Sequence, residues 1–320
     1  MLSPNTQVTL LLTAPLITGQ IESPDQLTSR EYTKFRQLLA QFDLEPAVLI
    51  SSSDLPHEVR GLVETDRYQQ LLGRRSQLTQ AVEFWTSLAI WVAGQTDEQY
   101  PKRFIEHMKD HAPPIVYGCG DTELLNTGGL AVVGSRDVDP ELVEFTENVG
   151  RLGARAHQTL ISGGARGIDQ AAMRGAAESG GKVIGVLADS LERAAVNRGN
   201  RELLTDSRLT LITVFDPSAG FNVGHAMQRN RLIYALGDAA LVVNSDVGKG
   251  GTWTGAIEQL EKLHFVPVYV RSTGQASEGL KALQEKGASL WPNPTTPQEF
   301  LEVLARRVQG KEQVKQLSFL

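Results

Sequence analysis

The 320-residue chain contains a single cysteine, Cys119, and no apolar run near the ~18 residues that a membrane-spanning helix requires. One cysteine excludes a disulfide framework and a cysteine-rich zinc site, and it agrees with a reducing compartment. No basic residues precede the short apolar stretch near the start, as they would in a secretory signal. These absences predict a cytoplasmic protein that does not associate with membranes.

Signatures of catalysis and metal binding are also scarce. The six histidines show no metal-ligand spacing, and no Gly-x-Ser-x-Gly motif marks a nucleophilic serine. The Gly-x-Gly-x-x-Gly fingerprint of dinucleotide-binding proteins and the Gly-Lys-Ser/Thr ending of a Walker A loop are missing as well. We therefore expect no metal and no cofactor, and a non-enzymatic role is favoured over catalysis.

Basic residues are fewer than acidic ones, 31 against 37, which gives a formal net charge of −6. This balance argues against a protein that coats duplex DNA without sequence preference. The excess is uneven, since residues 130–271 contain 15 Lys and Arg against 16 Asp and Glu, a net charge of −1. Several of these basic residues adjoin glycines, so the composition permits a local basic groove on an acidic protein.

Apolar residues follow two different periods along the chain. Residues 1–125 show mainly helical spacing, as over 30–43, and predict a smaller, mainly helical N-terminal domain whose end, 88–121, contains strands. From 126 to 310, short apolar runs alternate with helical patterns. This alternation predicts an α/β domain with a Rossmann-like, mostly parallel sheet covered by helices on both faces. Residues 311–320 are predicted to be a loose tail.

The expected elements can be stated by residue number. Strands are expected at 88–94, 113–121, 130–134, 158–162, 182–187, 209–213, 239–243, 265–270 and 288–291. Helices are expected at 30–43, 58–72, 76–84, 102–109, 140–155, 167–179, 199–206, 225–236, 252–263, 277–286 and 297–309. The glycines within 126–129 mark the expected linker between the two domains.

The strands at 130–134 and 158–162 end in glycine-rich turns that each carry one arginine. Because parallel strands end at one edge of a sheet, where free N–H groups and helix N-termini attract anions, both turns are expected to bind phosphate. Tight packing of the glycines is the structural alternative, and Asp169 is expected to cap the following helix. The candidates are Gly134, Ser135 and Arg136 in the first turn and Ser162, Gly163, Gly164, Ala165 and Arg166 in the second.

Two further segments combine cations with predicted helices. Arg229 and Arg231 diverge by about 200° around one helix, so one is expected to hold a ligand while the other makes an internal ion pair. The segment after the strand at 239–243 brings a lysine and glycine amides to a helix N-terminus. On that helix, Glu258 is a weak candidate for a general base. The candidate ligand-binding residues are Arg229, Asn230, Arg231, Lys249, Gly250, Gly251 and Thr252.

The order of these four segments resembles the DNA-processing protein A (DprA/Smf) family, within the wider group of LOG-like Rossmann folds. The matching segments are 133–136 (VGSR), 162–169 (SGGARGID), 229–233 (RNRLI) and 250–256 (GGTWTGA). The resemblance, which spans about 88–292, implies a non-enzymatic homodimer that binds single-stranded DNA and helps to load a recombinase. It also implies that Arg136, Arg166, Arg229 and the glycine turns line a groove for the phosphates of the strand.

The resemblance leaves several roles open. The chain is expected to be a divergent member without the family's C-terminal winged helix, and divergent relatives also serve mobile-element defence and toxin–antitoxin loci. In such a locus, residues 1–72 would restrain a partner toxin. A third possibility is a nucleotide sensor or a LOG-type phosphoribohydrolase, in which Arg136 holds a 5′-phosphate and Glu258 assists cleavage of the glycosidic bond.

Overall fold

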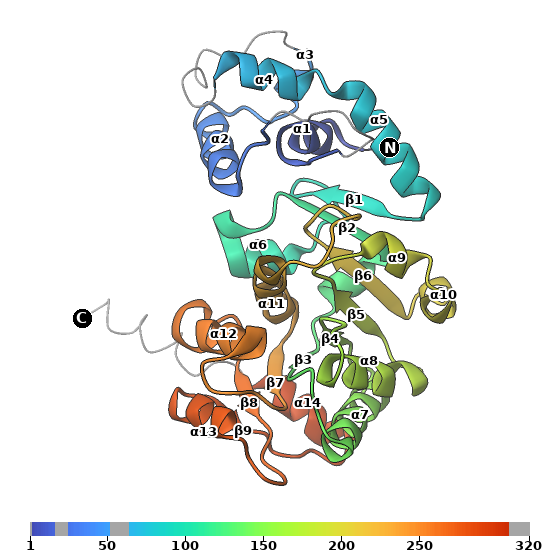
Figure 1. Ribbon diagram of the computed structural model, residues 1–320, viewed down its shortest axis with the longest axis vertical. Coiled ribbons are helices and arrows are strands. Elements are labelled where there is room, and N and C mark those ends of the chain that lie inside the picture. The colour runs from blue at the N-terminus through green and yellow to red at the C-terminus, as the bar shows by residue number, and fades with distance from the viewer. Residues whose placement is uncertain (1, 17–24, 52–63, 307–320) are drawn as a thin grey trace, which may run out of the picture.

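A nine-stranded sheet runs through the computed structural model, which describes residues 2–16, 25–51 and 64–306 (Figure 1). Its strands are β1 (Trp91–Gly94), β2 (Ile115–Gly120), β3 (Leu130–Val133), β4 (Leu160–Ser162), β5 (Val183–Val186), β6 (Leu209–Thr213), β7 (Ala239–Val242), β8 (Val268–Val270) and β9 (Ser289–Leu290). Their order across the sheet is β1-β2-β6-β5-β4-β3-β7-β8-β9. Pairs from β6 through β9 are parallel, and β1-β2 and β2-β6 are antiparallel. The expected Rossmann-like, mostly parallel sheet is confirmed.

The winding of the chain reverses at β3. After β3 the chain adds β4, β5 and β6 on one side, and it then returns to place β7 against the other side of β3. Strands β8 and β9 continue outward from β7. In open α/β sheets, ligands bind outside the carboxyl ends of the strands at such a reversal. The topology therefore directs attention to the ends of β3 and β7.

Strand β3 separates two hydrophobic cores. Its buried residues alternate, with Leu130 and Val132 in one core and Ala131 and Val133 in the other. Because a strand that is covered on both faces has apolar residues at every position, β3 could be predicted from the sequence. The first core is covered by α7 (Pro140–Arg155), α8 (Ile168–Glu178), α9 (Leu191–Ala195), α10 (Arg198–Thr205) and α14 (Pro297–Ala305). The second is covered by α6 (Lys102–Met108), α11 (Val223–Leu236), α12 (Gly250–Glu258) and α13 (Glu278–Glu285).

Local capping signals set the helix bounds. Helix α7 occupies the predicted range because Asp139 accepts a hydrogen bond from the Leu142 N–H at 2.8 Å and Pro140 lies in the first turn. Helix α12 ends at Glu258, before the predicted end at residue 263, and a π-helical turn follows over Gln259–Leu263. Helix α9 was not predicted. The predicted helix at 58–72 begins outside the described residues, whose helix starts at Thr65, and the predicted tail lies outside them too.

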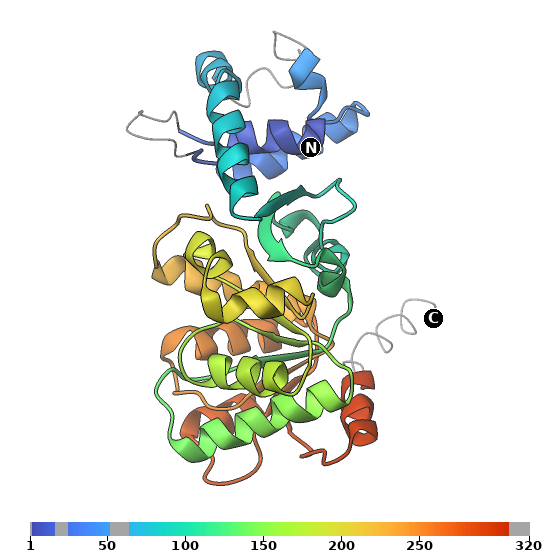
Figure 2. The same cartoon turned by 90° about the vertical axis from the view of Figure 1, so that its right-hand side faces the viewer.

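A helical region lies at the β1 end of the sheet (Figure 2). It contains α1 (Pro4–Thr13), α2 (Ser29–Gln41), α3 (Val48–Ser51), α4 (Thr65–Leu72) and α5 (Arg75–Ser87). Its own core includes the fully buried side chains of Phe35, Leu39 and Tyr68. None of the helices in the described part of the chain is long and apolar enough to cross a bilayer.

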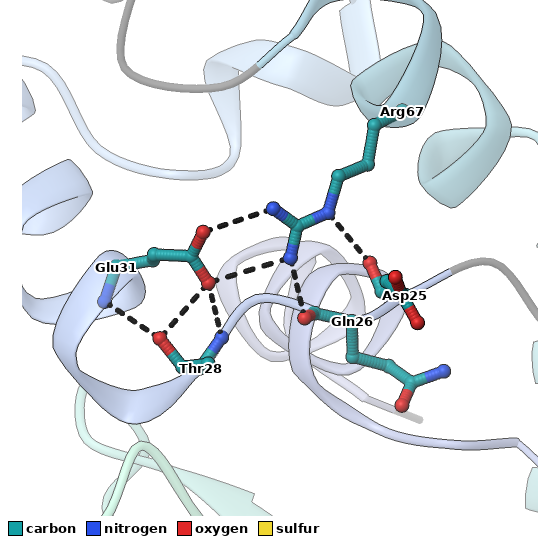
Figure 3. A network of polar contacts seen from close by, with 5 residues as sticks. All are labelled: Asp25, Gln26, Thr28, Glu31 and Arg67. Carbon is teal, nitrogen blue, oxygen red and sulfur yellow. Dashed lines mark hydrogen bonds and ion pairs between the residues drawn. The ribbon is translucent and has the colours of Figure 1, made fainter.

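Arg67 fastens the start of α2 to α4 (Figure 3). Its guanidinium donates to the Asp25 carbonyl at 2.8 Å and to the Gln26 carbonyl at 2.6 Å, and it pairs with Glu31 at 2.9 Å. Glu31 also accepts from the backbone N–H of Thr28, the N-cap of α2, to complete a capping box. The hydrogen bond from Arg67 is the main reason that the pKa of Glu31 falls from its usual 4.5 to about 2.

The expected linker at 126–129 is fixed within the sheet. Gly128 and Gly129 have φ values of 74° and 121°, and the Gly129 N–H donates to the Asp238 carboxylate at 2.7 Å. A Cβ on Gly129 would lie 2.0 Å from the carbonyl oxygen of Thr159, so glycine is required there. Strands on both sides of this segment in the sequence belong to one sheet, because β2 pairs with β6. The mainly helical region therefore ends with α5 in the structure.

Candidate functional site

Three of the segments predicted to bind phosphate meet at the carboxyl edge of the sheet. The Ile168 N–H, at the start of α8, donates to the Ser135 carbonyl at 3.2 Å, which joins the second turn to the first. The Thr252 hydroxyl donates to the Gly134 carbonyl at 2.8 Å, which joins the start of α12 to the first turn. A Cβ on Gly134 would lie 2.5 Å from Cγ1 of Ile168, so only glycine permits this approach.

Helix α11 brings the fourth segment to the same edge. Arg229 pairs with Asp169 of α8, with 3.4 Å between Nη1 and Oδ2. The Asn230 amide donates to the Gly251 carbonyl at 2.8 Å. The predicted meeting of the four segments is therefore observed, because parallel strands deliver their following turns to a single edge.

A crevice of about 410 Å³ opens at this edge, beside the ends of β3 and β7. Its lining comes from the turn after β3, from the loop and first turns of α11, and from the segment between β7 and α12. The lining includes Ser135, Arg136, Asp137, Ala165, Asp169, Phe221, Val223, Met227, Arg229, Asn230, Asp246, Lys249, Gly250, Gly251 and Thr252.

Two exposed cations reach this crevice. Arg136 lies over the ring of Phe221, with 5.1 Å from its Cζ to the ring centroid. Lys249 is the N-cap residue of α12 and makes no side-chain hydrogen bond to the amides of the first turn. Exposed Asp137 and Asp246 also line the crevice. Because cations and carboxylates are balanced here, the first-turn amides and dipole of α12 supply the additional attraction for an anion.

The rim of the crevice is unusually apolar for solvent-exposed surface. Phe221, Val223 and Met227 line the crevice and expose 55%, 66% and 41% of their areas, and Val247, next to the lining residue Asp246, exposes 48%. They account for four of the ten exposed large hydrophobic residues identified in the described part of the chain. The sequence prediction missed this rim, although Phe221 and Val223, apolar residues just before the predicted helix over 225–236, were a usable signal. Exposed apolar side chains gathered at a crevice favour ligand binding there.

The Arg229–Asp169 pair forms the floor of the crevice and is almost fully buried, with side-chain exposures of 7% and 6%. Burial raises the pKa of Asp169 above its usual value, while Arg229 acts in the opposite direction. Asp169 also accepts a hydrogen bond from the Gly163 N–H at 3.2 Å. A Cβ on Gly163 would lie 1.1 Å from Arg229 Nη1, so the guanidinium fills the space that a side chain would occupy.

Several expectations for the second turn require correction. Asp169 does not cap α8, whose N-cap is Gly167, because its carboxylate turns inward to Arg229. The Ser162 hydroxyl is buried and donates to the Val132 carbonyl at 2.6 Å, so it is committed inside the protein. Arg166 is exposed and lies outside the lining of the crevice. The second turn therefore supports the crevice, and of its predicted residues Ala165 reaches the lining.

Arg229 and Arg231 face opposite sides of α11, as their spacing predicted, but both pair with carboxylates. Arg231 makes a two-point contact with Glu258, with Nη2–Oε1 and Nε–Oε2 distances of 2.6 and 2.7 Å. Glu258 lies outside the lining of the crevice. Glu258 is therefore not placed to act as a general base on a nucleotide whose phosphate is bound in the crevice. Among the described residues, no group of three His, Cys, Asp or Glu side chains could hold a metal ion.

Comparison with known proteins gives one consistent family. A family model described as DNA recombination-mediator protein A matches residues 91–305. DNA processing protein DprA of Streptococcus pneumoniae is 28% identical over 183 residues, which cover 56% of this chain and 64% of the relative. This chain therefore spans less than two thirds of the length of that relative.

Solved structures show the same fold. The X-ray structure of DNA processing protein A from Streptococcus pneumoniae matches with a TM-score of 0.67 and 22% identity, over 86% of this chain and 93% of that chain. DNA processing protein A from Helicobacter pylori matches with a TM-score of 0.54 and 24% identity, over 67% of this chain and 95% of that chain. The latter structure concerns a single-stranded DNA binding mode.

Proposed function

The chain belongs to the DNA recombination-mediator protein A family, and we propose that it binds single-stranded DNA in the crevice beside the ends of β3 and β7. The observation that carries the proposal is that exposed cations, helix N-terminal amides and an exposed apolar rim occur together there. Phosphates require cations and N–H donors, whereas unpaired bases require apolar or aromatic surface on which to stack. Duplex DNA hides its base faces, so it would use only half of this surface.

The geometry supports division of the crevice between phosphates and bases. Arg136, Lys249 and the first-turn amides of α12 are suited to phosphate oxygens, and Phe221 and Met227 are suited to base faces. Contacts of these kinds carry little base information, so we expect binding with little sequence preference. With two phosphates neutralised, the logarithm of the association constant should fall with the logarithm of salt concentration with a slope of about −1.4.

The test is fluorescence anisotropy with an oligothymidylate of ~6 nucleotides, a length within the ~4–16 that a single-strand site covers. The double variant Arg136→Ala with Lys249→Ala should bind weakly and lose most of the salt dependence. Lys182→Ala is the matched control, because this exposed lysine precedes β5 at the opposite edge of the sheet. Affinity equal to wild type in the double variant would refute the proposal.

Within DNA processing and recombination, the finer expectations stay predictions. They are a non-enzymatic homodimer, a recombinase partner and, for a defence-associated relative, a toxin partner. Sedimentation velocity of the purified chain tests the first, since a dimer would have about 70 kDa against 34.9 kDa for one chain. The nucleotide-cleaving alternative receives no support from the site, because Glu258 is paired with Arg231 outside the crevice.

A further inference from the structure

A second cavity lies between α2 of the helical region and the helices α6 and α11. This groove has a volume of about 1230 Å³. One wall is α2, and the other is formed by α6, the 3-10 turn Lys109–His111, residues 214–216 and α11. Of the residues predicted from the sequence to bind a ligand, Arg231 lines this groove, and the crevice proposal does not use it.

The groove is basic on a protein of net charge −6. Its lining contains five Lys and Arg side chains, of which Arg231 is paired with Glu258, against two carboxylates. Arg30 and Lys34, one turn apart on α2, and Lys109 opposite them are exposed. Of the carboxylates, Asp110 accepts from the Gln37 amide at 3.3 Å, and Asp216 accepts from the Ser218 N–H at 2.9 Å. Local charge therefore favours a polyanion, because a cleft lined by one sign concentrates the field.

The groove also contains a stacked aromatic pair. The rings of Phe215 and His225 lie 3.8 Å apart at an interplanar angle of 11°, and both residues are half-buried at the groove wall. A partly exposed planar pair of this kind offers a face on which an unpaired base can stack. Cations and a stacking face are the two features that a single nucleic-acid strand needs.

Helix α11 is the common wall of the groove and the crevice, and it lies between α6 and α12 (Figure 1). Met227 and Asn230 line the crevice, whereas the adjoining Gln228 and Arg231 line the groove. The first turn of α11 between the cavities is exposed, with Val223 66% accessible. A flexible strand can therefore pass from one cavity to the other over this turn.

We infer that the groove is the second part of the single-stranded DNA site, so that a strand held in the crevice continues over α11 and along α2. This inference rests on the proposed function and extends it to the helical region. It predicts that short oligonucleotides use the crevice alone and that longer ones gain affinity and salt dependence from Arg30, Lys34 and Lys109.

The experiment compares oligothymidylates of ~6 and ~20 nucleotides, one within and one above the ~4–16 nucleotides that a single-strand site covers. The variant Arg30→Ala with Lys34→Ala should bind the short oligonucleotide like wild type but lose the additional affinity for the long one. Its salt slope on the long oligonucleotide should be smaller by about 1.4, the value for two lost phosphate contacts. Lys182→Ala with Arg201→Ala, two exposed cations outside both cavities, is the matched control.

The crevice variant Arg136→Ala with Lys249→Ala distinguishes a failure of the groove inference from a failure of the proposed function. If it loses binding while the groove variant binds the long oligonucleotide like wild type, the inference fails and the proposed function stands. If neither variant loses binding, both fail. Equal loss on both lengths in the groove variant would make the groove the primary site and overturn the continuous path. Melting temperatures of all variants establish that these surface substitutions leave the fold intact.

Discussion

The helical region and the crevice each contain an arginine paired with a carboxylate, and the two pairs behave in opposite ways. Arg67 and Glu31 expose 26% and 35% of their side chains, and hydrogen bonding lowers the pKa of Glu31 to about 2. Arg229 and Asp169 expose 7% and 6%, and burial raises the pKa of Asp169. The first pair is formed in contact with water and fastens local structure, whereas the second lost its hydration to hold the floor of a binding crevice.

Removal of one partner from the buried pair should have the largest effect. Arg229→Met leaves Asp169 buried without its cation, so the free energy of unfolding should fall by about 3–5 kcal/mol. Urea unfolding followed by circular dichroism measures this change. The double variant Arg229→Met with Asp169→Leu should recover much of the loss, because no unpaired charge then remains. A single variant as stable as wild type would contradict the assigned role of the pair.

A change that displaces the Arg229 guanidinium without removing it should have an intermediate effect. In Gly163→Ala the added methyl group takes the position of Nη1, and we expect a loss of about 1–3 kcal/mol as in other overpacked sites. Weaker DNA binding should accompany it, since the crevice floor shifts. Gly220→Ala is the control, because no atom lies within 4 Å of a Cβ there and its φ is not positive. Equal stability of the two variants would count against the tight fit.

Substitution in the Arg67–Glu31 pair should have the smallest effect on stability at neutral pH, and acid should remove that effect. Glu31→Gln retains a side chain suited to the capping box, so the expected loss at pH 7 is at most about 1 kcal/mol. The folded-state pKa of Glu31 is lower than its usual 4.5, so its contribution is complete above pH 4.5 and disappears as the pH falls toward about 2. Urea midpoints of wild type and variant should therefore converge over that interval, and a constant difference would exclude this linkage.

Asp169 has the reverse sign. Because its pKa is raised in the folded state, ionisation opposes folding, and acidification through that pKa removes part of this cost. The comparison of the two pairs thus predicts that acid weakens the helical region through Glu31, whereas protonation of Asp169 does not weaken the crevice floor. Hydrogen exchange at falling pH, resolved by region, distinguishes the two.

Local sequence patterns were sufficient for most elements of the sheet. The apolar run of β3 and the Asp139-Pro140 start of α7 act within a few residues, so they needed no tertiary information. The meeting of the four turns followed as well, because parallel topology determines where strands end. The positions of β1 and β2 did not follow, since pairing of β2 with β6 joins residues about 90 positions apart.

Which segments gather, and how Arg229 and Arg231 diverge, could be predicted from the residues alone, because strand direction and helical angle are local properties. Which charges remain for a ligand depends on how the folded chain packs. Arg229 forms an ion pair with Asp169, and Arg231 forms one with Glu258. Arg136 and Lys249 are exposed beside an apolar rim. Burial and ion pairing of a side chain depend on neighbours from distant parts of the chain, so residue spacing in the sequence does not predict them.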